Sequence, residues 1–181
     1  MKFVPTTLEG AFIVEPEVFG DERGFFLESY SRKEFAKAGI DVDFLQDNHS
    51  MSAKRGVLRG LHFQKPPHTQ EKLVRVVRGA VLDVIVDLRR KSPTFGKWES
   101  FKLSAKNFRM LFVPKGFAHG FCTLEDNTEF LYKASDFYAP KSEGGIAWND
   151  ADLGIDWPLK DLIINERDKN FPLLKELDNP F

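Results

Sequence analysis

The sequence predicts an all-β fold, a β-sandwich or barrel, with one short helix or a few. Short runs of β-branched, aromatic and aliphatic residues recur about every ten residues, and turn-forming Gly, Pro, Asn and Asp separate them. A clear helix signal occurs once. With 181 residues the chain is long enough to bury a full core and short enough for one domain, so we expect a single domain over residues 1–181.

The N-terminal part predicts a hairpin followed by the helix. The sequence F-G-D-E-R-G at residues 19–24 is a turn signal between two extended runs. The pattern S-x-x-E at residues 31–34 is a capping box, in which the Ser31 hydroxyl and the Glu34 carboxylate satisfy free amides of the first helical turn. Gly39 is the expected end of this helix.

Residues 43–51 (D-F-L-Q-D-N-H-S-M) are unusually polar for a segment between strands. Two interpretations stay open at this point. The segment is a turn-rich connection, or it is a row of donors and acceptors that orients a polar ligand.

The chain centres on residues 56–79, where charged and polar side chains stand among strand-forming aliphatics. Residues 57–64 and 73–78 predict strands, and Lys65-Pro66-Pro67-His68 predicts the turn between them. A hairpin with a structural role alone does not require this mixture of charged, polar and aliphatic side chains. We therefore interpret it as the wall of a site.

Arg59 and His62 are three residues apart, so a regular strand would point them to opposite faces. Gly60 between them predicts a β-bulge that turns both side chains the same way. Lys72 shares strand parity with two valines and so points toward an apolar face. Structural roles stay open for both: a lone strand histidine is more often a structural residue, and a lysine near a strand end usually reaches out to water.

Side chains in residues 80–88 alternate between two faces of a predicted strand. The face of the even-numbered residues is apolar and predicts core. The face of the odd-numbered residues places Asp83 among aliphatic side chains, where an ionised carboxylate needs a partner. Residues 91–96 predict a turn, and residues 98–103 another strand. His119 follows a P-x-G turn into the next strand. The polar residues 125–128 then predict a hairpin turn before another strand. The core face of residues 80–88 comprises Ala80, Leu82, Val84, Val86 and Leu88.

Composition excludes several function classes. The 26 Lys+Arg against 27 Asp+Glu give no global basic field for non-specific nucleic-acid binding, although a local anion site stays open. Cys122 is the only cysteine, which excludes an internal disulfide and suits a reducing compartment. The first residues lack an apolar leader, and the longest aliphatic run is broken by two aspartates, so we expect a soluble, cytoplasmic protein. Eighteen phenylalanines indicate an aromatic core or a large subunit contact.

The P-x-G-x-x-H pattern ending at His119, together with the strand pair closing on Gly79, resembles the two motifs of the cupin β-barrels, and so implies a cupin-type double-stranded β-helix, or jelly-roll barrel. In that superfamily, histidines and a glutamate bind a metal. Counting back from Gly79, those ligand positions fall on Pro66, His68 and Lys72. A cation stands where an anionic ligand belongs, so we expect no metal.

The whole chain closely resembles the dTDP-4-dehydrorhamnose 3,5-epimerase family. That family inverts C3 and C5 of dTDP-4-dehydro-6-deoxy-D-glucose on the route to dTDP-L-rhamnose, without a cofactor. One small departure is Asn165, where the family commonly has serine. The matching motifs are R-G-L-H-F-Q (59–64), Q-D-N-H-S (46–50), P-x-G-F-A-H-G-F (114–121), Y-K-x-x-D-F-Y-A-P (132–140) and S-E-G-G-I-x-W-N-D (142–150).

The resemblance implies four catalytic residues, which fit the chemistry of a proton α to a ketone. His62 matches the base, and Asp168, in a charged tail at 165–170 that is typical of a protein surface, matches the carboxylate that holds it. Tyr132 matches the acid on the opposite face of the sugar, and Lys72 matches the cation beside the enolate oxygen.

Binding roles also follow from the resemblance. Arg23 and Arg59 resemble the residues that hold the diphosphate, while Tyr138 and Phe26 are expected to stack on thymine. His119 would assist Lys72, with Asp83 as its partner. Further positions that match the nucleotide and sugar pocket are Glu28, Gln46, Asn48, Glu143 and Arg167.

Family members are homodimers whose N-terminal strands cross to the partner, so we expect the same here, with a dTDP-sugar as substrate and no nucleic acid or membrane as partner. The nearest alternative is a related 3- or 5-epimerase, or a 3,4-ketoisomerase on the same barrel. Two function classes are more distant: a metal-dependent cupin oxygenase and a non-catalytic nucleotide-sugar binding module. The lost metal ligands oppose the oxygenase, and the set of base, carboxylate and tyrosine opposes the binding module.

Overall fold

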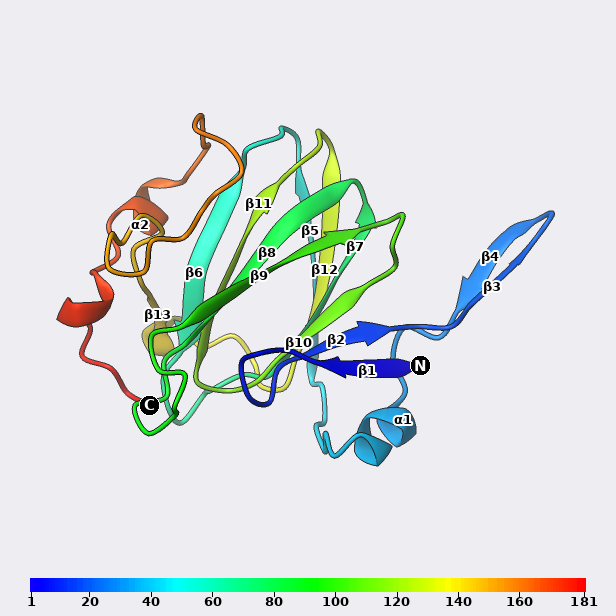
Figure 1. Ribbon diagram of the computed structural model, residues 1–181, viewed down its shortest axis with the longest axis horizontal. Helices are drawn as coiled ribbons and strands as arrows, with labels where there is room; N and C mark the ends of the chain where they lie inside the picture. The colour runs from blue at the N-terminus through cyan, green and yellow to red at the C-terminus, as the bar shows by residue number, and fades with distance from the viewer.

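The computed structural model describes residues 1–181 and consists mainly of two β-sheets that face each other as a barrel (Figure 1). The six-stranded sheet has the order β1-β2-β10-β7-β12-β5, and the five-stranded sheet has the order β13-β6-β11-β8-β9. The predicted all-β class is therefore confirmed. The strands are β1 (Lys2–Pro5), β2 (Phe12–Glu15), β3 (Val18–Asp21), β4 (Gly24–Leu27), β5 (Gln46–Ser52), β6 (Leu58–Gln64), β7 (Lys72–Arg78), β8 (Ala80–Asp87), β9 (Trp98–Ser104), β10 (Met110–Val113), β11 (Phe117–Thr123), β12 (Thr128–Ala134) and β13 (Glu143–Gly145), and the helices are α1 (Arg32–Lys37) and α2 (Glu166–Lys169), with 3-10 turns at Pro140–Ser142 and Leu174–Glu176.

The prediction of a hairpin across residues 125–128 is wrong. Strand β11 pairs with β6 and β8, whereas β12 pairs with β5 and β7 in the opposite sheet. The turn thus carries the chain from one wall of the barrel to the other. A polar turn between two apolar runs has the same composition whether the chain stays in one sheet or changes sheets, so the local pattern could not distinguish them.

Both faces of β8 are buried. The predicted core face is buried except at Leu82, which is half-buried, but it packs outward beneath the C-terminal segment, where Val84 and Val86 lie in one cluster with Leu174 and Phe181. The other face, which includes Asp83, points into the barrel, and its Val81 belongs to the cluster between the sheets. A strand covered on both sides carries apolar residues at nearly every position, so alternation alone could not identify the inner face.

The predicted helix forms as α1, which ends at Lys37 with Ala38 as its C-cap, and Gly39 follows with a φ of 80°, in the left-handed region that stops a helix. Its capping box does not form. Ser31 makes no side-chain cap bond, and Glu34 instead pairs with Lys37 at 2.7 Å. The helix is held mainly by burial of Phe35, whose ring contacts the rings of Phe3, Tyr30, Phe44 and Phe112, which confirms the expected aromatic core.

The polar segment 43–51 forms most of an edge strand, β5, so the turn-rich interpretation is wrong. Strand β5 pairs along its full length with β12. Its exposed side chains pair with that neighbour: Asp47 accepts a bond from Lys133, and His49 contacts Glu129. Because an edge strand faces water along one side, polar residues are tolerated there without loss of the ladder.

Strands β3 and β4 form the predicted hairpin, which projects away from the barrel (Figure 1). Its phenylalanines are unusually exposed: Phe19 by 56%, Phe25 by 60% and Phe26 by 70%. Rings of this size seldom gather on the surface of a protein without a partner. Neither helix has the length and apolarity that a membrane crossing requires.

Candidate active site

A cavity of about 210 Å³ opens between the two sheets, and polar side chains from several strands and from α2 line it. It brings together residues that lie more than a hundred positions apart in the sequence. Of the predicted catalytic residues, all four are present. The lining residues are Ser50, Arg59, His62, Lys72, His119, Gly120, Phe121, Phe130, Tyr132, Glu143, Asn165, Arg167 and Asp168.

The predicted bulge in β6 is confirmed. Against β11, His62 pairs with His119 and Arg59 pairs with Phe121. These two pairs are three residues apart along β6 but only two residues apart along β11, so β6 carries one extra residue. Arg59 and His62 consequently both line the cavity. Gly60 makes this possible, because its φ is 117° and a Cβ atom there would lie 2.6 Å from the Cα of Gly120. The two strands could not approach so closely with any larger residue.

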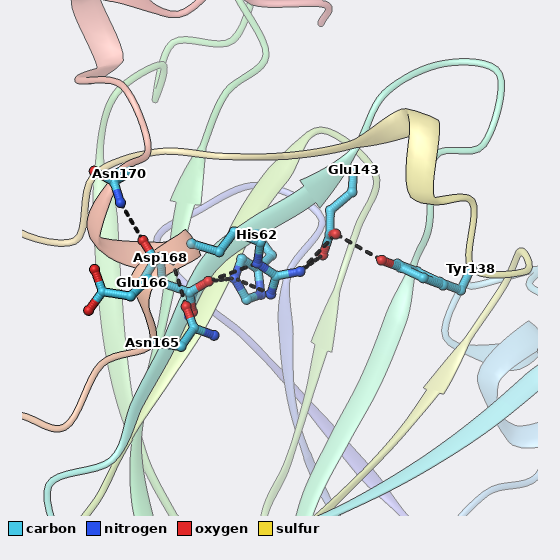
Figure 2. A network of polar contacts seen from close by, with 9 residues as sticks. His62, Tyr138, Glu143, Asn165, Glu166, Asp168 and Asn170 are labelled. Atoms are coloured by element: carbon cyan, nitrogen blue, oxygen red, sulfur yellow. Dashed lines mark hydrogen bonds and ion pairs between the residues drawn. The ribbon is translucent and has the colours of Figure 1, made fainter.

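His62 is held by Asp168 from the C-terminal segment. Its Nε2 lies 2.8 Å from Asp168 Oδ1, and the Gly60 amide donates to Asp168 Oδ2 at 2.9 Å (Figure 2). Asp168 is fully buried on the short helix α2, and the Asn165 side chain caps that helix by accepting from the Asp168 amide at 2.7 Å. Asparagine thus performs the capping role open to a serine at this position.

The electrostatics keep His62 neutral and Asp168 ionised. Burial lowers the pKa of His62 below 6.5, and Lys72 and Arg167 lower it too, whereas Asp168 opposes them. Burial raises the pKa of Asp168, but hydrogen bonds from His62 and the Gly60 amide outweigh it and bring this pKa to about 2. Because the carboxylate only accepts, the Nε2 proton points to Asp168. Nδ1 has no partner in the protein, so it is free to take up a proton.

Lys72 lies on the interior face of β7, in line with the buried Val74 and Val76 as its strand parity predicted. Burial lowers its pKa to about 8, although the carboxylates of Asp83 and Glu143 raise it. A lysine with this pKa holds its proton at neutral pH but gives it up more readily than a surface lysine.

Asp83 and His119 form a buried pair across β8 and β11. His119 Nε2 lies 3.0 Å from Asp83 Oδ1, as the expected partnership requires. Burial raises the pKa of Asp83, and the nearby His119 and Lys72 partly reverse the shift. The carboxylate orients the imidazole, which is one of the residues lining the cavity.

Tyr132 lines the same cavity from β12, in the sheet opposite to His62. Burial raises the pKa of its phenol, and the Glu143 carboxylate raises it further, while Arg59 lowers it. The Lys72 ammonium lies 6.0 Å from the centre of the ring. The phenol is therefore protonated at rest, with two cationic side chains near enough to favour a phenolate.

Glu143 links the cavity to a neighbouring hollow lined by Gln46, Asn48 and Tyr138, among others. It accepts hydrogen bonds from Arg167 at 2.8 Å and from the Tyr138 hydroxyl at 2.9 Å. Arg167 Nη2 in turn lies 3.3 Å from His62 Nε2, and Figure 2 shows Tyr138, Glu143 and His62 along this chain of contacts. Tyr138 is 52% exposed at the outer end of the chain.

Two buried donors near the site have no partner in the protein. They are the Nε of Arg59 and the Nδ2 of Asn48. An unpaired buried donor costs free energy, and a bound acceptor removes that cost. The guanidinium of Arg59 is suited to phosphate oxygens, so the unpaired donors favour an anionic, oxygen-rich ligand.

Three predicted site residues lie elsewhere. Arg23 and Phe26 belong to the projecting hairpin, where Arg23 Nε bonds to Asp21 at 3.0 Å, and Glu28 follows the hairpin directly. None of them lines the cavity of its own chain. Conversely, Ser50 and Asn165 line the cavity although neither was predicted to have a specific role there, and Ser50 belongs to the polar row at residues 43–51 that was held open as a ligand-orienting segment. Ser50 was detectable as the last residue of the Q-D-N-H-S motif, and Asn165 as a possible cap three residues before Asp168.

The chain as a whole matches a known enzyme family. The family model described as dTDP-4-dehydrorhamnose 3,5-epimerase matches residues 5–176. The enzyme of that name from Shigella flexneri is 53% identical over 171 residues, covering 94% of each chain. A Streptomyces niveus protein named dTDP-4-dehydrorhamnose 3-epimerase is 41% identical over 177 residues, covering 97% of this chain and 85% of its own.

The fold also matches that of a solved structure. The 3,5-epimerase from Legionella pneumophila, in complex with dTDP-4-keto-L-rhamnose, superposes with a TM-score of 0.94 at 46% identity, covering 98% of this chain and 94% of its own. The cupin-type barrel predicted from the motifs is therefore confirmed. The match extends over nearly the whole chain in sequence and in structure. The chain belongs to the dTDP-4-dehydrorhamnose 3,5-epimerase family.

Proposed function

We propose that this protein inverts C3 and C5 of dTDP-4-dehydro-6-deoxy-D-glucose and so forms dTDP-4-dehydro-L-rhamnose, in dTDP-L-rhamnose biosynthesis. The observation that carries the proposal is the pair of proton-transfer groups on opposite walls of one cavity. His62 with Asp168 stands on the five-stranded sheet, and Tyr132 stands on the six-stranded sheet. Inversion at carbon requires a base on one face and an acid on the other.

Each inversion begins with loss of the proton α to the C4 ketone. Neutral His62 takes this proton on Nδ1, and the C–H electron pair moves to the ketone oxygen, giving an enolate. Asp168 stabilises the imidazolium that results, because its carboxylate accepts a hydrogen bond from Nε2–H at 2.8 Å and stays ionised. The proton taken from one face is thereby held within the site.

The enolate oxygen carries the developing negative charge, and Lys72 with His119 supplies the opposing charge and hydrogen bonds. Tyr132 then gives its phenolic proton to the opposite face of the carbon, which completes the inversion, and the phenolate is stabilised by the nearby Lys72 and Arg59. The imidazolium and phenolate return to their resting states by proton exchange with water. No electrons are gained or lost, so the reaction needs no redox cofactor.

The nucleotide part of the substrate would occupy the hollow beside Glu143. The unpaired donors of Arg59 and Asn48 fit diphosphate and carbonyl oxygens, and the exposed ring of Tyr138 fits a stacked thymine. Gln46 and Arg167 line the same hollow. Remote binding of this kind holds the sugar against His62, where it lowers the barrier to proton transfer.

Incubation with the substrate in heavy water tests the proposal. Deuterium at both C3 and C5, read by mass spectrometry and proton NMR, together with formation of the L-lyxo product, would support double epimerisation. Deuterium at one carbon would instead support a single-site epimerase, an alternative favoured by the similarity to the Streptomyces niveus 3-epimerase. A shift of the carbonyl to C3 would identify a 3,4-ketoisomerase.

The pH dependence of kcat/KM should be bell-shaped. Activity needs neutral His62, whose pKa lies below 6.5, so activity falls only below that pH. It also needs protonated Lys72, so activity falls again as pH rises through about 8. In Lys72→Met the plateau should drop roughly 100-fold. The alkaline limb near pH 8 should vanish, leaving only the fall at higher pH from ionisation of the Tyr132 phenol, whose pKa is raised. The acid limb should move to higher pH, because Lys72 no longer depresses the pKa of His62. An unchanged alkaline limb in this variant would contradict its assignment to Lys72.

We further infer that the single domain works as a homodimer in which the hairpin β3–β4 reaches the partner. The exposed Phe19, Phe25 and Phe26 support this. More than half of each ring is exposed, and the contacts they have within the chain are the pairing of Phe19 with Phe26 across the hairpin and an edge contact between Phe25 and Phe108. Crossing would also bring Arg23 and Phe26 toward the partner's cavity. This arrangement accounts for predicted binding residues that lie outside the cavity of their own chain.

Light scattering tests the homodimer. The native chain should have twice the mass of one chain, and Phe19→Asp should shift it toward monomer with a matching loss of turnover. Phe95→Asp is the control, because Phe95 is also exposed, by 41%, but lies far along the sequence from the hairpin and outside the cavity. A Phe19→Asp variant that remains dimeric would exclude the hairpin as the main contact.

A further inference from the structure

We propose that Gln64 is a positioning residue for nucleotide binding, because its carboxamide fixes the loop that carries Tyr138. Gln64 is the last residue of β6, two positions after His62, and only 5% of it is exposed. It lines neither the cavity nor the neighbouring hollow. The inference rests on the proposed function, since the role of Tyr138 in binding the base belongs to that proposal.

The carboxamide of Gln64 is fully engaged with backbone groups. Its Nε2 donates to the carbonyl of His68 at 2.7 Å and to that of Phe137 at 3.1 Å, and its Oε1 accepts from the Ala139 amide at 2.7 Å. Both amide protons and the oxygen are thereby used. A buried amide satisfied in this way resists displacement, because any rotation leaves buried partners unpaired.

These contacts surround Tyr138. Gln64 bonds the residue before Tyr138 through its carbonyl and the residue after Tyr138 through its amide, which is how a paired strand bonds its neighbour. The loop needs such a substitute because strand β12 ends at Ala134. The amide of Tyr138 itself donates to Gln46 Oε1 at 3.0 Å.

The ring of Tyr138 depends on this support. It is 52% exposed, and the one hydrogen bond of its side chain joins the hydroxyl to Glu143. Surrounding side chains therefore restrain the ring little, and its location follows from the backbone beneath it. A ring held in place before the ligand arrives loses less entropy on stacking than a mobile one.

Gln64→Leu tests the inference because leucine has a similar volume and makes none of the three bonds. We expect dTDP to bind roughly tenfold more weakly by calorimetry, as expected from partial loss of one stacking contact. KM for the dTDP-sugar should rise to match, and kcat at saturation should stay within about twofold. Gln64→Glu keeps an acceptor for the Ala139 amide but sets a carboxylate oxygen against the carbonyls of His68 and Phe137, so it should show the same split between KM and kcat.

A double-mutant cycle separates this route from others. If Gln64 acts through Tyr138, the double variant Gln64→Leu with Tyr138→Ala should bind dTDP no more weakly than Tyr138→Ala alone. If the two substitutions instead multiplied their separate effects on the dTDP dissociation constant, the inference would be overturned. Gln64 would then act through another residue, such as Glu143, which pairs with Gln64 in the sheet. A fall in kcat without a change in affinity would overturn it as well, because it would indicate an effect on His62.

Asn179→Leu is the matched control. The Asn179 carboxamide also bonds backbone on both sides, donating to the Leu88 carbonyl at 2.6 Å and accepting from the Phe181 amide at 3.0 Å, but it lies outside the site. It should lose stability without a change in dTDP affinity. If Tyr138→Ala has no effect on dTDP affinity, the inference fails, while isotope incorporation by the native chain would leave the proposed function standing.

Discussion

Replacing His62 by alanine should lower kcat by roughly 10³-fold, because a positioned general base contributes about that factor to proton transfer. The dTDP affinity should stay near the native value, since His62 does not itself line the nucleotide hollow and meets it only through Arg167, which Glu143 also holds. Deuterium incorporation at both carbons should be lost with turnover. Isotope-ratio mass spectrometry after incubation in heavy water measures this directly.

His68→Ala is the matched control for this prediction. His68 also pairs with an aspartate, its Nδ1 lying 3.1 Å from Asp136 Oδ2, but it is outside the cavity. It should keep native turnover, and both variants should unfold cooperatively. If His62→Ala kept near-native turnover, the base would have to be another residue. If His68→Ala abolished turnover, His68, which stands at one of the metal-ligand positions of the cupin motif, would be essential for activity.

Tyr132→Phe should stop inversion while leaving exchange in place. The variant lacks only the phenolic oxygen, so His62 can still remove the α proton and return a solvent-derived one to the same face. We expect deuterium in recovered substrate with its configuration retained, and formation of the inverted product lowered by roughly 10²-fold or more. Proton NMR of the recovered sugar distinguishes exchange with retention from inversion.

Tyr30→Phe is the control for the tyrosine prediction. The Tyr30 hydroxyl donates to the Val42 carbonyl at 3.1 Å among aromatic rings near α1, away from the cavity. It should keep native turnover. Inversion at a native rate in Tyr132→Phe would show that the second proton comes from elsewhere, and loss of both exchange and inversion would indicate that the tyrosine also orients the substrate.

Local patterns predicted much of the fold, because alternation and turn residues identify strands one at a time. The bulge at Gly60 could be predicted since two polar residues three apart need one extra residue to share a face. The change of sheet at residues 125–128 could not, because it depends on which partner each strand finds. The same limit concealed the inner face of β8, where Asp83 meets His119.

The site could be predicted only as far as motifs extended. Asp168 lies in a charged stretch that composition assigns to the surface, yet it is fully buried because it bonds to a histidine 106 positions earlier. Nothing local encodes such a contact, and only the family resemblance indicated it. Gln64 escaped notice for the same reason, as its partners Phe137 and Ala139 lie more than seventy positions away.

The long separation between His62 and Asp168 has a consequence for the order of folding. Closing a long loop costs more chain entropy than forming a local contact, so we expect this contact to form after short-range pairs such as β8 with β9. Strands close in sequence can then pair before α2 docks against β6, at a stage when the imidazole of His62 has no carboxylate to hold it. We expect recovery of turnover during refolding to follow the docking of α2, and circular dichroism to follow the pairing of those strands.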